Sequence, residues 1–160
     1  MQRKASTLET IMTNSSLTIR PYDTEDNAVL TDIWYSASRV AHHFLGEGKL
    51  QEQRSLISKL YLPQAETWVA CIDGAPVGFM GLMNNFVGGI FVSPEAQGKG
   101  VGQALIAYGL ELKGGLNLDV YALNTRTCEF YKRLGFVETD RRSTDKEGLP
   151  FEEISMYLSN

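Results

Sequence analysis

The segment 92–102, VSPEAQGKGVG, joins an apolar run to a helical pattern, and it constrains the fold more than any other part of the chain. Apolar residues 89–92 predict a buried strand, and the spacing of the apolar residues after the segment predicts a helix that begins near Gly100. Gly98, Gly100 and Gly102 stand at alternate positions between the two. The first amides of a helix lack partners within it and carry roughly half a positive charge, so a start without side chains exposes them to an anion. The segment therefore predicts an α/β fold with an anion site between a strand and a helix.

The rest of the sequence predicts the element order β-α-α-β-β-β-α-β-α-β-β. Apolar and alternating runs mark strands at 17–20, 67–72, 76–82, 85–92, 116–123, 135–138 and 154–158. Helical spacing and capping residues mark helices from Asp23 or Thr24 to near His42, from the break at 46–48 to just before Pro63, from Gly100 to Gly114, and from Thr125 to Leu134. We therefore expect an α/β fold with a mixed central sheet of about six or seven strands, flanked by about four helices.

Two pairs of residues predict the shape of the central strands. Asp73-Gly74 tolerates the positive φ angles of a tight turn, so the strands before and after it form a hairpin. Gly88-Gly89 lies inside a strand, where glycine marks a bulge or the close approach of another backbone. We expect the sheet to open at this second pair.

Length, charge and cysteine content limit the class of protein. The chain has 160 residues, which suits a single domain over 17–160, while the polar residues 1–16 predict a disordered tail. A net charge of −4 argues against a nucleic-acid partner, and the absence of an apolar run of about 18 residues argues against a membrane span. Cys71 and Cys128 lie in apolar stretches, as reduced thiols of a cytoplasmic protein do, and no Cys/His cluster predicts a metal.

Three phosphate-binding patterns compete for the glycine-rich segment. A Walker A motif is excluded because Lys99 is followed by Gly100 rather than by Ser or Thr. A Rossmann fingerprint is disfavoured because Gln103 stands where its third glycine or alanine belongs, and because the segment lies past the middle of the chain. The third pattern, Gln97-x-x-Gly100-x-Gly102 after a strand ending at Val92, resembles the acetyl-CoA loop of the GNAT N-acetyltransferases.

A second stretch strengthens this resemblance. Asn124, then Phe130-Tyr131, then Gly135-Phe136 resemble the second GNAT motif in order and spacing, with Thr127 where the family usually has alanine. The chain is most similar to small bacterial members of about 150 residues. They share its Ile33-Trp34, its His-x-Phe-Leu (residues 42–45) and its Trp68-Val69-Ala70. The resemblance covers about 17–158 and implies the GNAT fold.

The resemblance implies acetyl-CoA as cofactor and acetyl donor. Backbone amides of the loop would wrap the pyrophosphate, and the strand before it would pair with the pantetheine arm. Asn124 either contacts CoA or caps the following helix, and the two roles are equally consistent with the sequence. Lys99 either adds a charge to the phosphate site or is simply a solvated lysine. The basic residues Arg126, Lys132 and Arg133 either meet the 3′-phosphate or are solvated. The predicted cofactor-binding residues are Ile90, Phe91, Val92, Gln97, Gly98, Lys99, Gly100, Val101, Gly102, Gln103 and Asn124.

The resemblance also gives Tyr131 the role of general acid to the CoA thiolate in a direct ternary-complex transfer. The alternative is packing, since Tyr131 shares one helical face with Thr127, Phe130 and Leu134. No general base is evident, because Asn84 and Asn85 stand where the family often has a carboxylate. The candidates are His42, His43, Glu47, Glu66 or a chain of waters.

The acceptor implied is a primary amine of a small molecule, a peptide or a protein lysine. The predicted acceptor-site residues are Trp34, His42, Phe44, Leu45 and Asn85. For His42 a plain helix-end histidine that complements the helix dipole is the alternative. The chain is expected to be a monomer or homodimer. A CoA-binding sensor or partner-binding module without catalysis, or an ATP-binding protein using the same loop, remains an alternative function.

Overall fold

The computed structural model describes residues 16–160, so residues 1–15 of the predicted tail lie outside the described part of the chain. One seven-stranded sheet has the order β1-β2-β3-β4-β5-β7-β6, and β4 and β5 run parallel while all other neighbours are antiparallel. The predicted mixed sheet and order of elements are confirmed. The strands are β1 (Leu17–Pro21), β2 (Glu66–Ile72), β3 (Ala75–Met83), β4 (Phe86–Val92), β5 (Gly115–Tyr121), β6 (Val137–Arg142) and β7 (Glu153–Ser159).

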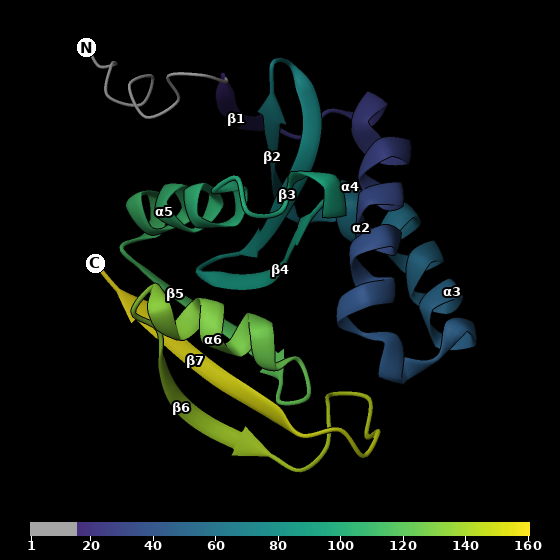
Figure 1. Cartoon of the computed structure of the whole chain (residues 1–160), viewed down its shortest axis with the longest axis vertical. Coiled ribbons are helices and arrows are strands. Elements are labelled where there is room, and N and C mark those ends of the chain that lie inside the picture. The colour runs from purple at the N-terminus through teal and green to yellow at the C-terminus, as the bar shows by residue number, and fades with distance from the viewer. Residues whose placement is uncertain (1–15) are drawn as a thin grey trace.

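Four helical segments flank the sheet, with α5 and α6 in one group and α2 with α3 in another (Figure 1). They are α2 (Asn27–Ala41), α3 (Glu47–Leu56), which continues through the π-helical turn Ile57–Tyr61 into α4 (Leu62–Gln64), α5 (Val101–Lys113) and α6 (Thr125–Arg133). The predicted helix end before Pro63 is wrong, because helical backbone continues past this proline to Gln64. Proline has no amide to donate to the turn before it, and the Ser58 carbonyl of that turn accepts from the side-chain amide of Asn27 at 2.9 Å. Among residues 16–160, no helix is long and apolar enough to span a membrane.

The core lies on both faces of the sheet because β2 and β3 bury alternate residues on each side. Ala70 and Met80 join the cluster under α5 and α6, whereas Val69 and Phe79 join the cluster under α2 and α3. Both cysteines are free and buried in these clusters, as the sequence predicts. Because each face is covered by its own helices, β4 in the middle separates two different environments.

The local turn chemistry follows the sequence closely. Asp73 and Gly74 have φ angles of 51° and 85°, so the predicted hairpin turn is confirmed. Three strand ends differ from the prediction by two residues or more, and one of them is the end of β6, which runs on to Arg142 instead of stopping at residue 138. Strand β5 ends at Tyr121, because the Asn124 amide donates to the Tyr121 carbonyl and closes a turn. Strand β6 begins at Val137, because Gly135 has a φ of 107° that no regular strand contains.

The predicted opening at Gly88-Gly89 is confirmed. The β3–β4 register shifts between Gly81 and Leu82, so Gly88 has no residue opposite it. On its other edge, β4 pairs with β5 only through Phe86–Asn117 and Val87–Leu118. The two parallel strands then part, which leaves the backbone of β4 from Gly88 to Val92 without a neighbour from β5.

Candidate functional site

The loop between β4 and α5 has the geometry of an anion site. Gly98 and Gly100 have φ angles of 83° and 82°, which favour glycine, and a Cβ added at either would meet open space. No side chain caps α5, and the Ala104 amide is the first to donate along the helix, to the Gly100 carbonyl at 3.0 Å. The amides of Val101, Gly102 and Gln103 therefore face the loop. This arrangement fits a pyrophosphate bound by backbone donors.

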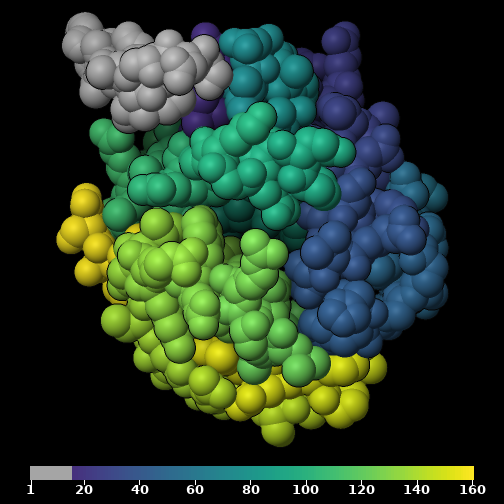
Figure 2. All heavy atoms as spheres, in the orientation of Figure 1, coloured from purple at the N-terminus to yellow at the C-terminus, as the bar shows by residue number. Residues whose placement is uncertain are grey.

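Side chains of the loop fix its position. The Gln97 side-chain amide donates to the Val92 carbonyl at 3.3 Å, and Val101 is buried in the core. A Cβ at Gly102 would lie 3.2 Å from the ring of Phe130, so this glycine allows α6 to pack closely on α5. Figure 2 shows a narrow recess between the spheres of these two helices.

Four cations near this loop and on α6 have no ion-pair partner within residues 16–160. Lys99 is exposed in the loop, and Arg126, Lys132 and Arg133 are exposed on α6. In the same part of the chain, every other lysine and arginine except Lys59 forms an ion pair. The same loop and helix also carry two exposed carboxylates that form no ion pair with any described residue, Glu95 and Glu129, so these segments hold four free cations against two free anions.

Two predicted residues of the second motif differ in their surroundings. Asn124 precedes α6 but its side chain makes no capping hydrogen bond, so the alternative of a helix cap is wrong. Tyr131 is 7% exposed and packs edge-on against Phe136, with ring centroids 5.3 Å apart. Burial raises the pKa of the Tyr131 phenol, which therefore keeps its proton at neutral pH. Ile90 and Val92 pack against the same cluster.

A cavity of about 570 Å³ lies on the other face of β4, between that strand and α2–α3. None of the residues that line it is Asp, Glu, Lys or Arg. Three apolar side chains at its edge are about half exposed, namely Leu56, Leu60 and Met83. The full lining is Trp34, His42, Gln53, Leu56, Ile57, Leu60, Tyr61, Gln64, Ala65, Met83, Gly88, Phe91 and Tyr121.

The predicted acceptor-site residues divide between this cavity and its surroundings. Trp34 and His42 line it, as does Phe91, which was predicted for the cofactor and packs 6.2 Å from the Trp34 ring. Phe44 lies behind the lining, with its ring centroid 5.2 Å from that of Tyr121.

Leu45 and Asn85 also lie away from the lining. Leu45 packs into the α2–α3 cluster. Asn85 lies in the turn before β4, where its carbonyl accepts from the Asn117 amide at 2.9 Å. Sequence reasoning missed Tyr61 and Tyr121, which line the cavity from segments distant in the chain.

The candidate general bases also divide into residues that line the cavity and residues that do not. Glu66 is engaged by Lys113 at 2.8 Å and by the Trp68 indole at 2.9 Å, and Glu47 bonds to Tyr35 and Gln51. Neither carboxylate lines the cavity.

Of the two histidines, His43 is exposed, whereas His42 lines the cavity. Burial lowers the pKa of His42 to about 4, so its imidazole is neutral at neutral pH. A neutral ring does not complement the helix dipole, which removes the alternative role predicted for His42.

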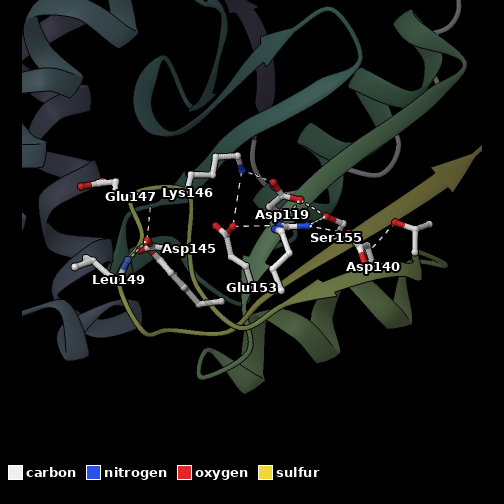
Figure 3. A network of polar contacts seen from close by, with 11 residues as sticks. Asp119, Asp140, Asp145, Lys146, Glu147, Leu149, Glu153 and Ser155 are labelled. Atoms are coloured by element: carbon white, nitrogen blue, oxygen red, sulfur yellow. Dashed lines mark hydrogen bonds and ion pairs between the residues drawn. The ribbon is translucent and has the colours of Figure 1, made fainter.

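A polar network holds the Tyr121 side of the cavity (Figure 3). The buried Asp145 accepts hydrogen bonds from the amides of Glu147 and Leu149 at 3.0 and 2.9 Å and from the Tyr121 hydroxyl at 2.9 Å. Lys146 of the same loop contacts Asp119. Within residues 16–160, no group of His, Cys, Asp and Glu side chains is arranged to hold a metal ion. The acidic residues of this network are engaged by neighbouring cations, hydroxyls and amides.

Comparison with known proteins identifies the family. The sequence model of the acetyltransferase (GNAT) domain matches residues 63–138. Peptidyl-lysine N-acetyltransferase YjaB of Salmonella typhimurium is 34% identical over 141 residues, which cover 88% of this chain and 97% of that protein. Peptidyl-lysine N-acetyltransferase YiaC of Escherichia coli is 29% identical over 133 residues, which cover 82% of this chain and 91% of that protein. The solution structure of apo-form YjaB from Escherichia coli matches with a TM-score of 0.82 and 31% identity, covering 89% of this chain and 97% of that one. The chain therefore belongs to the GNAT N-acetyltransferase family.

Proposed function

We propose that this protein transfers the acetyl group of acetyl-CoA to the side-chain amine of lysine residues in proteins. One observation carries the proposal. Strand β4 leads into the glycine-rich loop, loses its β5 neighbour after Val87, and borders the uncharged cavity through Gly88 and Phe91. A donor held along β4 and an amine held in the cavity would meet at this strand. Lysine as acceptor is supported by two relatives that are named peptidyl-lysine N-acetyltransferases.

The donor site uses backbone groups more than side chains. Amides at the start of α5 bind the pyrophosphate, and the free edge of β4 over Ile90–Val92 pairs with the extended arm of the donor. The exposed cations Lys99, Arg126, Lys132 and Arg133, which form no ion pair within residues 16–160, attract the phosphates. When bound, acetyl-CoA supplies a thioester whose carbonyl carbon is the electrophile.

The acceptor site suits an aliphatic amine that has lost its proton. A lysine side chain in water has a pKa near 10.4, and transfer into an uncharged, largely apolar cavity lowers that pKa because it disfavours the ammonium form. Leu56, Leu60 and Met83 offer apolar contact to the methylene groups. Water receives the proton, because an imidazole whose pKa is lowered to about 4 is a weak base at neutral pH.

Tyr131 is proposed as the general acid of the departing thiolate. Its phenol is buried and protonated, and it lies in the same cluster as Ile90 and Val92 of the donor strand. Transfer is direct, without a covalent enzyme intermediate. Cys128 is buried with a raised pKa, and Cys71 is buried in the other cluster, so neither thiol resembles an activated nucleophile.

The proposal is tested with purified protein, acetyl-CoA and peptides that carry one lysine and a blocked N-terminus. Release of CoA thiol and acetyl-lysine detected by mass spectrometry would support it, and matched peptides with arginine in place of lysine provide the control. Acetylation of small amines alone would overturn lysine as the acceptor. Stabilisation by acetyl-CoA without CoA release for any acceptor would support the CoA-binding sensor instead, and stabilisation by ATP alone would overturn the donor assignment.

A further inference from the structure

The Tyr61 hydroxyl is buried and has no hydrogen-bond partner within residues 16–160, although its side chain lines the cavity. Burial raises the pKa of this phenol to about 12, so it is neutral and has both a proton to donate and lone pairs to accept. Folded proteins pair nearly all buried polar atoms, and those left unpaired often belong to a functional site.

Two glycines make room for this hydroxyl. A Cβ added at Gly81 of β3 or at Gly88 of β4 would overlap the Tyr61 hydroxyl oxygen. Gly88 is also the bulge residue of β4, opposite no residue of β3 and beyond the last pair with β5. The hydroxyl therefore lies against Gly88, a residue that lines the cavity and belongs to the unpaired backbone of the proposed donor strand.

The backbone that carries Tyr61 is irregular. Residues Ile57–Tyr61 form a π-helical turn between α3 and α4. Such turns are rare, and they occur frequently at functional sites because the extra residue redirects the side chains around it. Here Ile57, Leu60 and Tyr61 of the turn all line the cavity.

We propose that the Tyr61 hydroxyl oxygen accepts a hydrogen bond from the attacking amine and thereby orients its lone pair toward the donor strand. This inference rests on the proposed function. The amine nitrogen bonds to the acetyl carbon as the carbon–sulfur bond breaks, its surplus proton leaves to water, and the thiolate receives the Tyr131 proton. Tyr61 neither gains nor loses a proton. The nitrogen becomes positive as the bond forms, so this hydrogen bond strengthens in the transition state and raises kcat.

The test is Tyr61→Phe, which keeps the ring and removes only the hydroxyl. We expect kcat/KM for a lysine peptide to fall by roughly 10- to 100-fold, the loss of one hydrogen bond to a charged group, while KM for acetyl-CoA changes less than about twofold. The melting temperature should stay the same or rise, because the variant no longer buries an unpaired hydroxyl. Tyr108→Phe is the control, since Tyr108 packs against Trp68 with ring centroids 4.8 Å apart and does not line the cavity.

The outcomes separate the two proposals. Wild-type protein that transfers no acetyl group to any lysine peptide would overturn both. Active wild type with an equally active Tyr61→Phe variant would overturn the role of Tyr61 alone. A variant that loses melting temperature in parallel with activity would also overturn it, because the hydroxyl would then be structural.

Discussion

The imidazole of His42 packs edge-on against the Tyr121 ring, with centroids 5.3 Å apart and an angle of 80° between the planes. His42 directly follows α2 as its C-cap, and Tyr121 ends β5, so this contact joins the two walls of the cavity. Phe44 completes the aromatic group, 6.0 Å from the His42 ring. The surroundings of the imidazole are thus apolar, which is why burial lowers its pKa to about 4.

This contact predicts a pH-dependent stability. Below its unfolded pKa near 6.5, His42 binds a proton in the unfolded chain, but the folded chain binds it only near pH 4. Above pH 6.5 the neutral His42 therefore costs the fold nothing. As the pH falls toward 4, its titration lowers the free energy of unfolding by about 3 kcal/mol in total. Urea unfolding of wild type and His42→Phe at several pH values measures the difference. Parallel pH curves for the two proteins would show that His42 titrates normally in the folded state.

Tyr131→Phe should lower kcat by roughly 10²- to 10⁴-fold, the usual contribution of one proton donor. The ring packing against Phe130 and Phe136 is retained, so the affinity for acetyl-CoA and the melting temperature should change little. Single-turnover kinetics with a lysine peptide measure the effect. Tyr157→Phe on β7 serves as the control. Unchanged turnover would leave Tyr131 with a packing role only.

Gly100→Glu should abolish binding of acetyl-CoA, because it places a negative side chain at the bare start of α5. Gly100→Ala is the matched control. It imposes the same left-handed φ of 82° on a residue with a Cβ, a strain of about 1 kcal/mol, without adding charge. Isothermal titration calorimetry of both variants separates the two effects. Tight binding by the glutamate variant would mean that the phosphates lie elsewhere.

Much of the fold was predictable because its signals are local. The Asp73-Gly74 turn and the Gly114 cap depend on φ angles that only a few residue types adopt, and both occur where the sequence predicts them. The opening after Gly88-Gly89 follows from missing side chains in a strand. Pro63 misled the prediction, because helical backbone continues past it to Gln64. The Ser58 carbonyl of the π-helical turn accepts from Asn27, a contact between distant segments that the sequence does not show.

The acceptor side was less predictable because it is assembled from distant segments. Phe44 follows His42 closely in sequence, yet the turn His43–Leu45 directs its ring onto Phe151, with centroids 5.1 Å apart, rather than into the cavity. Tyr61 belongs to no sequence motif. The position of its hydroxyl depends on two glycines that approach it only in the folded sheet. The donor loop is one contiguous segment, which is why its residues could be named from the sequence.

Asp145→Asn should weaken the acceptor side while sparing the donor loop. Asp145 accepts three hydrogen bonds, and although its burial acts to raise the pKa of its carboxyl, these bonds hold that pKa below its usual value. We expect a loss of about 1–3 kcal/mol in the free energy of unfolding and a higher KM for the lysine peptide, with unchanged affinity for acetyl-CoA. Asp140→Asn is the control, because Asp140 is exposed and pairs with Arg142 at 3.4 Å. Equal stability of the two variants would contradict a role for Asp145 in holding the loop.

Gly88→Ala should reduce acceptor turnover by displacing the Tyr61 hydroxyl, since the added Cβ would overlap that oxygen. The nearest carbon of the Tyr61 ring, Cε1, would lie 3.1 Å from the same Cβ. The effect should therefore be smaller in a Tyr61→Phe background, and the two substitutions should be non-additive. A double-mutant cycle on kcat/KM for the lysine peptide measures this coupling. Gly48→Ala is the control, because its Cβ would meet no atom within 4 Å. Fully additive losses would show that Gly88 acts on turnover by a route other than Tyr61, for instance through the backbone of the bulge itself.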